Sequence, residues 1–166
     1  MKWTTKQLTT MALLTAIALA IHVAEAQIPP FVAIPGVKLG LANIITIYAA
    51  FSIGGGAAAM ILIARILLGS MFGGGVVSFL YSIAGGLLCL FVTLLLRRVL
   101  TQKQIWVAGV MGAIAHNIGQ ILVAIVVTGT PSILSYLPIL LISGILTGLF
   151  TGFAAQAVVN RIHRNP

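Results

Sequence analysis

Three charged residues stand apart from the other charges in this strongly apolar sequence. Lys38 and Arg65 are basic, and Glu25 is the only acidic residue in the chain. His22 joins them as a further ionisable residue. Ionisable groups at membrane depth are costly and usually face a bundle interior or a water-filled cavity. One acid cannot neutralise two bases, so we expect these residues to form a net positive pocket for the anionic group of a ligand. The alternative is a structural ion pair between Glu25 and one of the bases.

A second polar group occurs in the run A-H-N-I-G-Q. His116 and Gln120 are four residues apart and Asn117 and Gln120 three apart, so on a helix they share one face. Asn43 is a further candidate for the same site. These residues either form the polar wall of a substrate-binding site or join helices by hydrogen bonds worth about 0.6 kcal/mol each.

The stretch I-P-P-F-V-A-I-P-G-V-K, residues 28–38, precedes the second apolar segment. Its prolines restrict the backbone and reduce the entropy that closing over a ligand would cost. We expect a lid over an outward-facing pocket, with Phe31 as part of an apolar flap and Lys38 at the charged end. A rigid interfacial loop would have a similar sequence.

The composition assigns the chain to the integral membrane proteins. Of its 166 residues 60% are hydrophobic and 6% are charged, with a mean hydropathy of +1.19, whereas soluble domains carry about 25% charged residues. A lone cysteine, Cys89, excludes a disulfide framework. No P-loop motif occurs, so ATP is not bound by that device. We expect no cofactor, no metal and no nucleic-acid partner.

Six apolar segments predict an all-α bundle in a single transmembrane domain, residues 1–166. Segments two and three fall short of the roughly 20 residues that a crossing requires. They form either a kinked hairpin or helices buried in protein. The approximate segments are residues 8–23, 39–53, 57–68, 76–96, 105–127 and 133–159.

The remaining basic residues predict the orientation. They precede the first segment, separate the fourth from the fifth and follow the sixth: Lys2, Lys6, Arg97, Arg98, Lys103, Arg161 and Arg164. Six crossings would place all seven on one side, as the positive-inside rule requires. We therefore expect a multi-pass protein of the cell membrane with both termini in the cytoplasm. The first segment could alternatively be a signal peptide, but its removal would break this parity.

Alanines recur every fourth residue in the first segment, at Ala12, Ala16, Ala20 and Ala24. On a helix they form one smooth stripe that allows close approach of another helix. The stripe either packs within the bundle or docks a separate membrane subunit.

The string P-G-V-K-L-G-L-A-N-I, following I-P-P-F, resembles the Gx transporter family, which is also labelled heptaprenyl diphosphate synthase component I. The likeness covers nearly the whole chain, including the A-H-N-x-x-Q run. More broadly, the chain is similar to the S components of energy-coupling factor (ECF) transporters. That resemblance implies a six-helix substrate-binding subunit, which captures a small molecule near the outer face and docks on a T subunit with two ATPases. It also implies that Ala12, Ala16 and Ala20 form the docking face.

The two family labels suggest different functions. Prenyl diphosphate synthases bind magnesium diphosphate through aspartate-rich motifs, and this chain has no aspartate. We therefore expect a protein that is not an enzyme. The favoured function is capture of a small, partly apolar anionic metabolite, with quinone and isoprenoid precursors as candidates. The alternative is a non-catalytic membrane accessory subunit of a prenyl diphosphate synthase.

Overall fold

The computed structural model describes residues 3–27 and 40–164, and within these ranges the chain is helical and contains no strand. The predicted all-α class is confirmed. A π-helical turn (Ser70–Gly74) joins the third and fourth helices, and short 3₁₀ turns (Gln102–Gln104 and Pro131–Tyr136) precede the last two. The helices are α1 (Thr5–Ala26), α2 (Asn43–Ser52), α3 (Gly55–Gly69), α4 (Gly75–Leu96), α5 (Ile105–Thr128) and α6 (Leu137–Arg164).

Among the described helices, all but α2 are long and apolar enough to cross a bilayer, so the chain is a multi-pass membrane protein. The third apolar segment is longer than predicted, because with the π turn it runs over Gly55–Phe72, 18 residues. At 1.5 Å per residue α2 is roughly 15 Å long, about half the hydrocarbon thickness. Only the second segment is therefore too short to cross as a helix.

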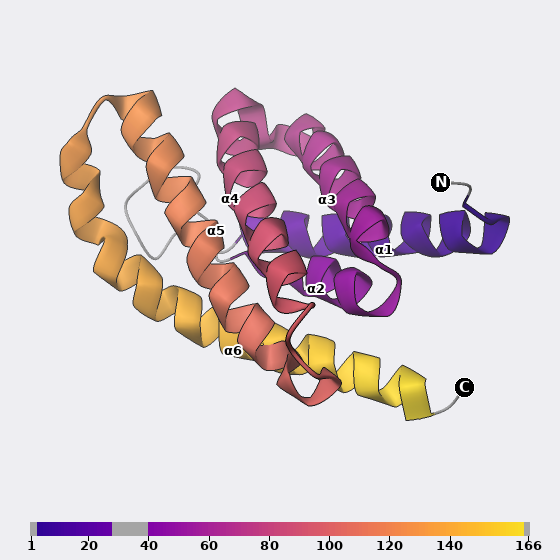
Figure 1. Ribbon diagram of the computed structural model, residues 1–166. Helices are drawn as coiled ribbons and strands as arrows, with labels where there is room; N and C mark the ends of the chain where they lie inside the picture. Colours follow the sequence, from indigo (N-terminus) through magenta and orange to yellow (C-terminus); the bar gives the residue numbers. More distant parts are fainter. Residues whose placement is uncertain (1–2, 28–39, 165–166) are drawn as a thin grey trace.

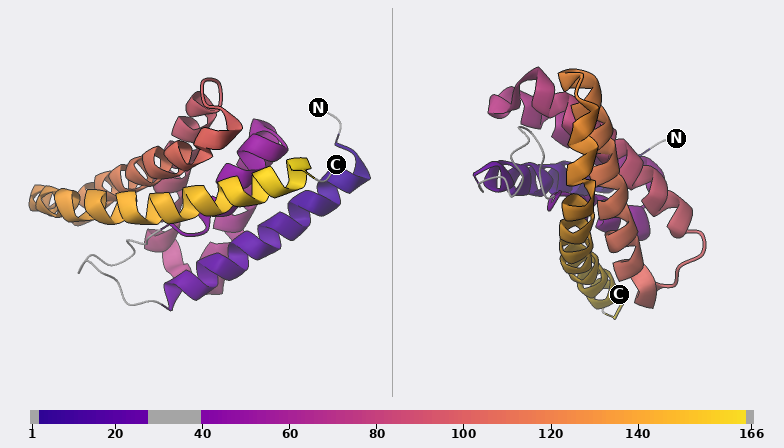
Figure 2. Two further views of the ribbon diagram at one scale, coloured as in Figure 1. Left: turned by 90° about the horizontal axis from the view of Figure 1, so that it is seen from below. Right: turned by 90° about the vertical axis from the view of Figure 1, so that its left-hand side faces the viewer.

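Figures 1 and 2 show how the helices alternate between two ends of the molecule. The start of α1, the α2–α3 turn, the α4–α5 connection and the end of α6 lie toward one end. The α3–α4 and α5–α6 connections lie toward the other. Exposed basic residues gather at the first end, which we call the basic end: Lys6, Arg97, Arg98, Lys103 and Arg161.

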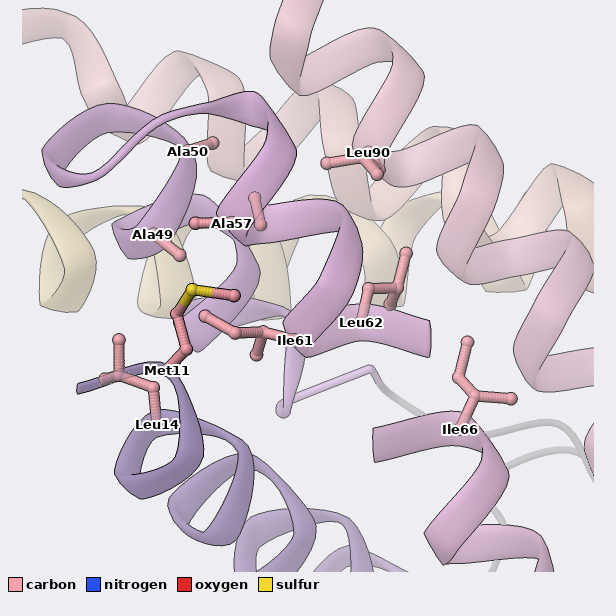
Figure 3. Close-up of a cluster of buried hydrophobic side chains, with 10 residues drawn as sticks. Met11, Leu14, Ala49, Ala50, Ala57, Ile61, Leu62, Ile66 and Leu90 are labelled. Atoms are coloured by element: carbon pink, nitrogen blue, oxygen red, sulfur yellow. The ribbon is translucent and has the colours of Figure 1, made fainter. Parts of the chain in front are cut away.

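Small residues allow the first four helices to pack closely (Figure 3). Ala49 and Ala50 of α2 and Ala57 of α3 are fully buried, and Met11 of α1 packs in the same cluster. Lipid is as apolar as these side chains, so close van der Waals packing rather than the hydrophobic effect holds such helices together. The cluster also contains Leu14, Ala58, Ile61, Leu62, Ile66 and Leu90.

Glycines bring α5 and α6 together. Gly144, Gly148 and Gly152 repeat every fourth residue of α6. A Cβ on Gly148 would lie 2.6 Å from the Cα of Val110 and 2.8 Å from the carbonyl oxygen of Gly109. Because those atoms belong to the backbone, only glycine fits at this crossing. This G-x-x-x-G-x-x-x-G stripe fixes α6 against α5.

Candidate functional site

A small polar cavity lies where α1, α3, α4, α5 and the turn before α2 meet. Its volume is about 10 Å³, close to what one water molecule requires. Because five separate parts of the chain contribute, the packing of the helices assembles the site. The lining residues are His22, Glu25, Gly40, Arg65, Ser82, His116 and Gln120.

The carboxylate of Glu25 joins the end of α1 to the turn that leads into α2. The backbone N–H of Gly40 donates to Oε1 at 2.5 Å, and that of Leu41 donates to Oε2 at 3.0 Å. The residue at the N-terminal cap of α2, Ala42, offers no side-chain acceptor. Glu25 thus supplies a negative charge beside the N-terminal end of a helix, where the helix dipole favours it.

Arg65 is the positive group of the cavity. Its side chain is 3% exposed, and its Nε atom has no hydrogen-bond partner among the described residues. Arg65 interacts electrostatically with Glu25, which lines the same cavity. A buried guanidinium with an unused donor is costly in a protein interior. An oxygen atom supplied by a bound molecule or by water would satisfy that donor.

His116 and Asn43 both lie against Gly40. A Cβ on Gly40 would be 2.9 Å from Asn43 Nδ2 and 3.2 Å from His116 Cδ2. Gly40 also has a φ of +78°, which disfavours other residues. On the α4 side, a Cβ on Gly85 would be 2.8 Å from two atoms of the imidazole ring of His116. Glycines on both sides therefore make room for the buried imidazole.

Asn117 points away from its neighbours in the A-H-N-I-G-Q run. Its Nδ2 atom donates to the carbonyl oxygen of Leu140 on α6 at 2.6 Å, and it is not among the residues that line the cavity. His116 and Gln120 do line the cavity, whereas Asn117 bridges α5 and α6. Phe31 and Lys38, which the sequence also suggested for the site, lie outside the described residues.

The imidazole of His22, which the sequence placed with the ionisable residues, also lines the cavity. His22 is buried against Gly69, where a Cβ would be 2.9 Å from its Cδ2. Ser82 and Gly40, which the sequence did not single out, complete the lining. Ser82 carries no signal in the sequence, since one serine in an apolar helix commonly bonds its own backbone.

The alanine stripe of α1 lies on the surface of the chain. Ala12, Ala16 and Ala20 are all exposed, while Ala18 between them is buried. The stripe therefore does not pack within the bundle, which was one of its two interpretations. A smooth exposed strip on a membrane helix faces either lipid or another protein.

The cavity offers nitrogen and hydroxyl donors together with one carboxylate. The described residues contain no group of three or more His, Cys, Asp and Glu side chains that could hold a metal ion. The arrangement fits recognition of a polar group by hydrogen bonds and charge.

Comparison with known proteins gives one match. A family model described as heptaprenyl diphosphate synthase component I matches residues 14–158. No curated protein and no solved structure matches the chain. The matched region contains all the residues that line the cavity, from His22 to Gln120. The chain therefore belongs to the heptaprenyl diphosphate synthase component I family.

Proposed function

We propose that this chain is the substrate-binding membrane subunit, or S component, of an ECF-type importer. It would capture a small, partly apolar anionic metabolite from the outer face. The observation that carries this proposal is Arg65, a buried arginine with an unused donor on a polar cavity. An intramembrane ionisable residue of this kind marks a substrate or ion pathway by default.

The position of the cavity supports the same function. The cavity lies toward the end of the bundle opposite the basic end, because its residues come from the late part of α1 and α3 and the early part of α4. If the basic end faces the cytoplasm, as the positive-inside rule predicts, the cavity lies in the outer half of the membrane. Lys38, two residues before Gly40 in the sequence, would add a second positive charge there.

The exposed alanine stripe supports a partner in the membrane. Ala12, Ala16 and Ala20 offer a surface on which a helix of a T subunit could approach closely. The sequence has no P-loop motif, so the energy for release and transport would come from two associated ATPases.

The family description favours a second candidate. A heptaprenyl diphosphate synthase component I would be a membrane accessory subunit of a two-part prenyl synthase. The exposed basic end, with Arg97, Arg98 and Lys103, would then be the surface that contacts the soluble catalytic component. The two candidates differ in their partner.

The deciding experiment isolates the tagged full-length chain from native membranes in a mild detergent and identifies the proteins that accompany it by mass spectrometry. We expect a T-type membrane protein and two ATPases. Ala16→Leu should abolish their recovery, because a larger side chain fills the stripe. Ile17→Leu is the matched control, since Ile17 is a neighbouring exposed residue of α1, and it should leave recovery intact.

Recovery of a soluble prenyl synthase without ATPases would contradict the importer proposal and support the accessory subunit. If the T-type protein and the ATPases are recovered equally well with Ala16→Leu, the importer proposal stands. The alanine stripe is then not the docking face.

A further inference from the structure

We propose that the polar cavity is a hydration site, in which one water molecule accepts a hydrogen bond from Nε of Arg65. The water would join α3 to the polar residues that α1, α4 and α5 bring to the cavity. The inference goes beyond the proposed function and does not depend on it, because the same water would serve an importer subunit or an accessory subunit.

The volume of the cavity sets the first limit on its occupant. That volume is about 10 Å³, which is close to the smallest space that holds a water molecule. Helices α1, α3, α4 and α5 and the turn before α2 all contribute to the walls. A metabolite would therefore enter only after these walls had separated. In the arrangement that the structure describes, the occupant has the size of water.

The charge of the cavity sets the second limit. Arg65 and Glu25 both line it and interact electrostatically, so their opposite charges offset each other. The two side chains are 3% and 5% exposed, and an uncompensated charge is costly in such surroundings. An added ion would bring one, whereas a neutral molecule would not. The balance of charge therefore favours water over an ion.

The lining offers the hydrogen-bonding groups that a buried water requires. Such a water typically makes about three bonds to buried polar groups. Nε of Arg65 is a donor without a partner among the described residues, and a buried donor of a charged group is costly to leave unpaired. The water oxygen would accept this bond. Its hydrogens would be donated to oxygens of the same lining, which belong to Glu25, Ser82 and Gln120.

Hydroxyl-radical footprinting with X-rays tests for this water in the detergent-solubilised full-length chain. The experiment is run at about pH 8, where histidine is ordinarily neutral, so that His22 and His116 add no charge to the cavity. Irradiation splits a bound water where it sits, and the radicals modify the side chains around it. A radical scavenger suppresses modification by bulk water, and mass spectrometry identifies the modified residues.

We expect His22 and His116 to be modified although they are 7% and 4% exposed. Tyr81 is the internal control, because it is 2% exposed and is not among the residues that line the cavity. It should remain unmodified. A crystal structure that shows ordered water should place one density peak within hydrogen-bonding distance of Nε of Arg65, roughly 2.7–3.2 Å.

A cavity-filling variant links the modification to the cavity. Ser82→Val would put an apolar side chain in the space of the water and should abolish modification of His22 and His116. Ser78→Val is the matched control, because it makes the same change one helical turn earlier on α4, at a residue outside the lining. It should leave the modification intact. If Ser82→Val does not fold, the comparison of His116 with Tyr81 in the wild-type chain remains decisive.

A wild-type chain in which surface residues are modified and both histidines are not would have a dry cavity, which would overturn the inference. Modification that persists in a folded Ser82→Val variant would also overturn it, because water would then reach the histidines by another route. Density too large for water would replace the hydration site with a bound ligand and support the proposed pocket. A dry cavity would leave the importer proposal standing, since that proposal is decided by the partners of the chain.

Discussion

Arg65 and Asn117 are both buried polar side chains between membrane helices, and their surroundings differ. The amide of Asn117 donates to Leu140 on the neighbouring helix at 2.6 Å. The Nε donor of Arg65 has no partner among the described residues and faces a cavity. A satisfied donor stabilises helix packing, whereas an unsatisfied one is free to bind a ligand oxygen. This contrast makes Asn117 a residue that joins two helices and leaves Arg65 as a candidate binding residue.

Asn117→Ala should therefore lower stability without weakening binding. Loss of the interhelical hydrogen bond should reduce the free energy of unfolding by about 0.6 kcal/mol, and by no more than roughly 1.7 kcal/mol. Unfolding in mixed micelles by titration with SDS measures this difference. The matched control is Ser143→Ala, because Ser143 Oγ donates to the same carbonyl oxygen from within α6 at 3.3 Å, and its loss should cost less.

The affinity of Asn117→Ala for farnesoic acid, an isoprenoid carboxylate of the proposed ligand class, should stay within about twofold of the wild-type value, while Gln120→Leu should weaken it. A variant of Asn117 that loses binding with unchanged stability would place this residue in the binding site after all.

The sequence predicted part of the candidate site. The cost of charge in a membrane singled out Glu25 and Arg65, and helical spacing linked His116 with Gln120. Helical spacing could not separate Asn117 from His116 and Gln120. One turn of a helix can contact two neighbouring helices, and only the packing determines which neighbour each side chain faces. Gly40 and Ser82 were missed because neither residue type is unusual in such a sequence. Their role comes from contacts between segments far apart in the chain.

At the scale of elements, backbone contact between α5 and α6 determines how closely these helices can approach. Gly109 and Gly148 face each other with their backbones in contact range. On the same two helices, the rings of Trp106 and Phe153 stack with centroids 5.7 Å apart. The backbone N–H of Trp106 donates a hydrogen bond to Oε1 of Gln156 at 3.3 Å. The α5–α6 pair thus forms a rigid unit near the basic end.

Gly148→Ala should separate this pair. The added Cβ would lie 2.6 Å from the Cα of Val110, and backbone atoms cannot rotate away. We expect a loss of about 1–3 kcal/mol in the free energy of unfolding, the usual cost of overpacking. Thermal unfolding in detergent measures the loss. Leu146→Phe is the control, because Leu146 is 64% exposed on the same helix. Equal stability of both variants would contradict the close crossing.

The sequence predicted the positions of the longer helices better than those of the short ones. Hydropathy placed the fourth segment at 76–96, and α4 is Gly75–Leu96. For the sixth it indicated a start at residue 133, but Pro131–Tyr136 forms a 3₁₀ turn and the α-helix begins at Leu137. The π turn at Ser70–Gly74 was also missed. Apolar composition does not distinguish these hydrogen-bonding patterns, because they bury the same side chains.

At the scale of the whole molecule, the alternation of the chain between two ends gives the protein two chemically different faces. The α4–α5 connection carries Arg97, Arg98 and Lys103, whereas the described α3–α4 and α5–α6 connections carry no charged residue. Such asymmetry orients a protein in its membrane. The cavity lies toward the uncharged end, so the orientation of the protein determines which side of the membrane the cavity lies nearer to.

Cysteine labelling in intact cells tests this orientation. Gln102 and Ser132 are exposed residues in opposite connections, and Cys89 is 1% exposed and should not react. We expect a membrane-impermeant maleimide to label Ser132→Cys in intact cells and Gln102→Cys only after permeabilisation. The wild-type chain, with Cys89 alone, is the control. The reverse labelling pattern would show the opposite orientation in the membrane. Labelling of both positions from outside would contradict the alternation of the helices between two ends.

The short helix α2 has a consequence for how the protein enters the membrane. With ten residues it cannot span the bilayer alone, and its partner α3 carries Arg65, a residue that costs about 2.5–3.5 kcal/mol at the centre of an inserting helix. Neither helix is therefore well suited to enter the membrane by itself. We expect the pair to enter as a hairpin after α1 has inserted. Glu25 of α1 would then accept hydrogen bonds from the turn that leads into α2 and offset the positive charge of Arg65 on α3. The polar residues of the cavity would then serve the protein during its synthesis, before any ligand is present.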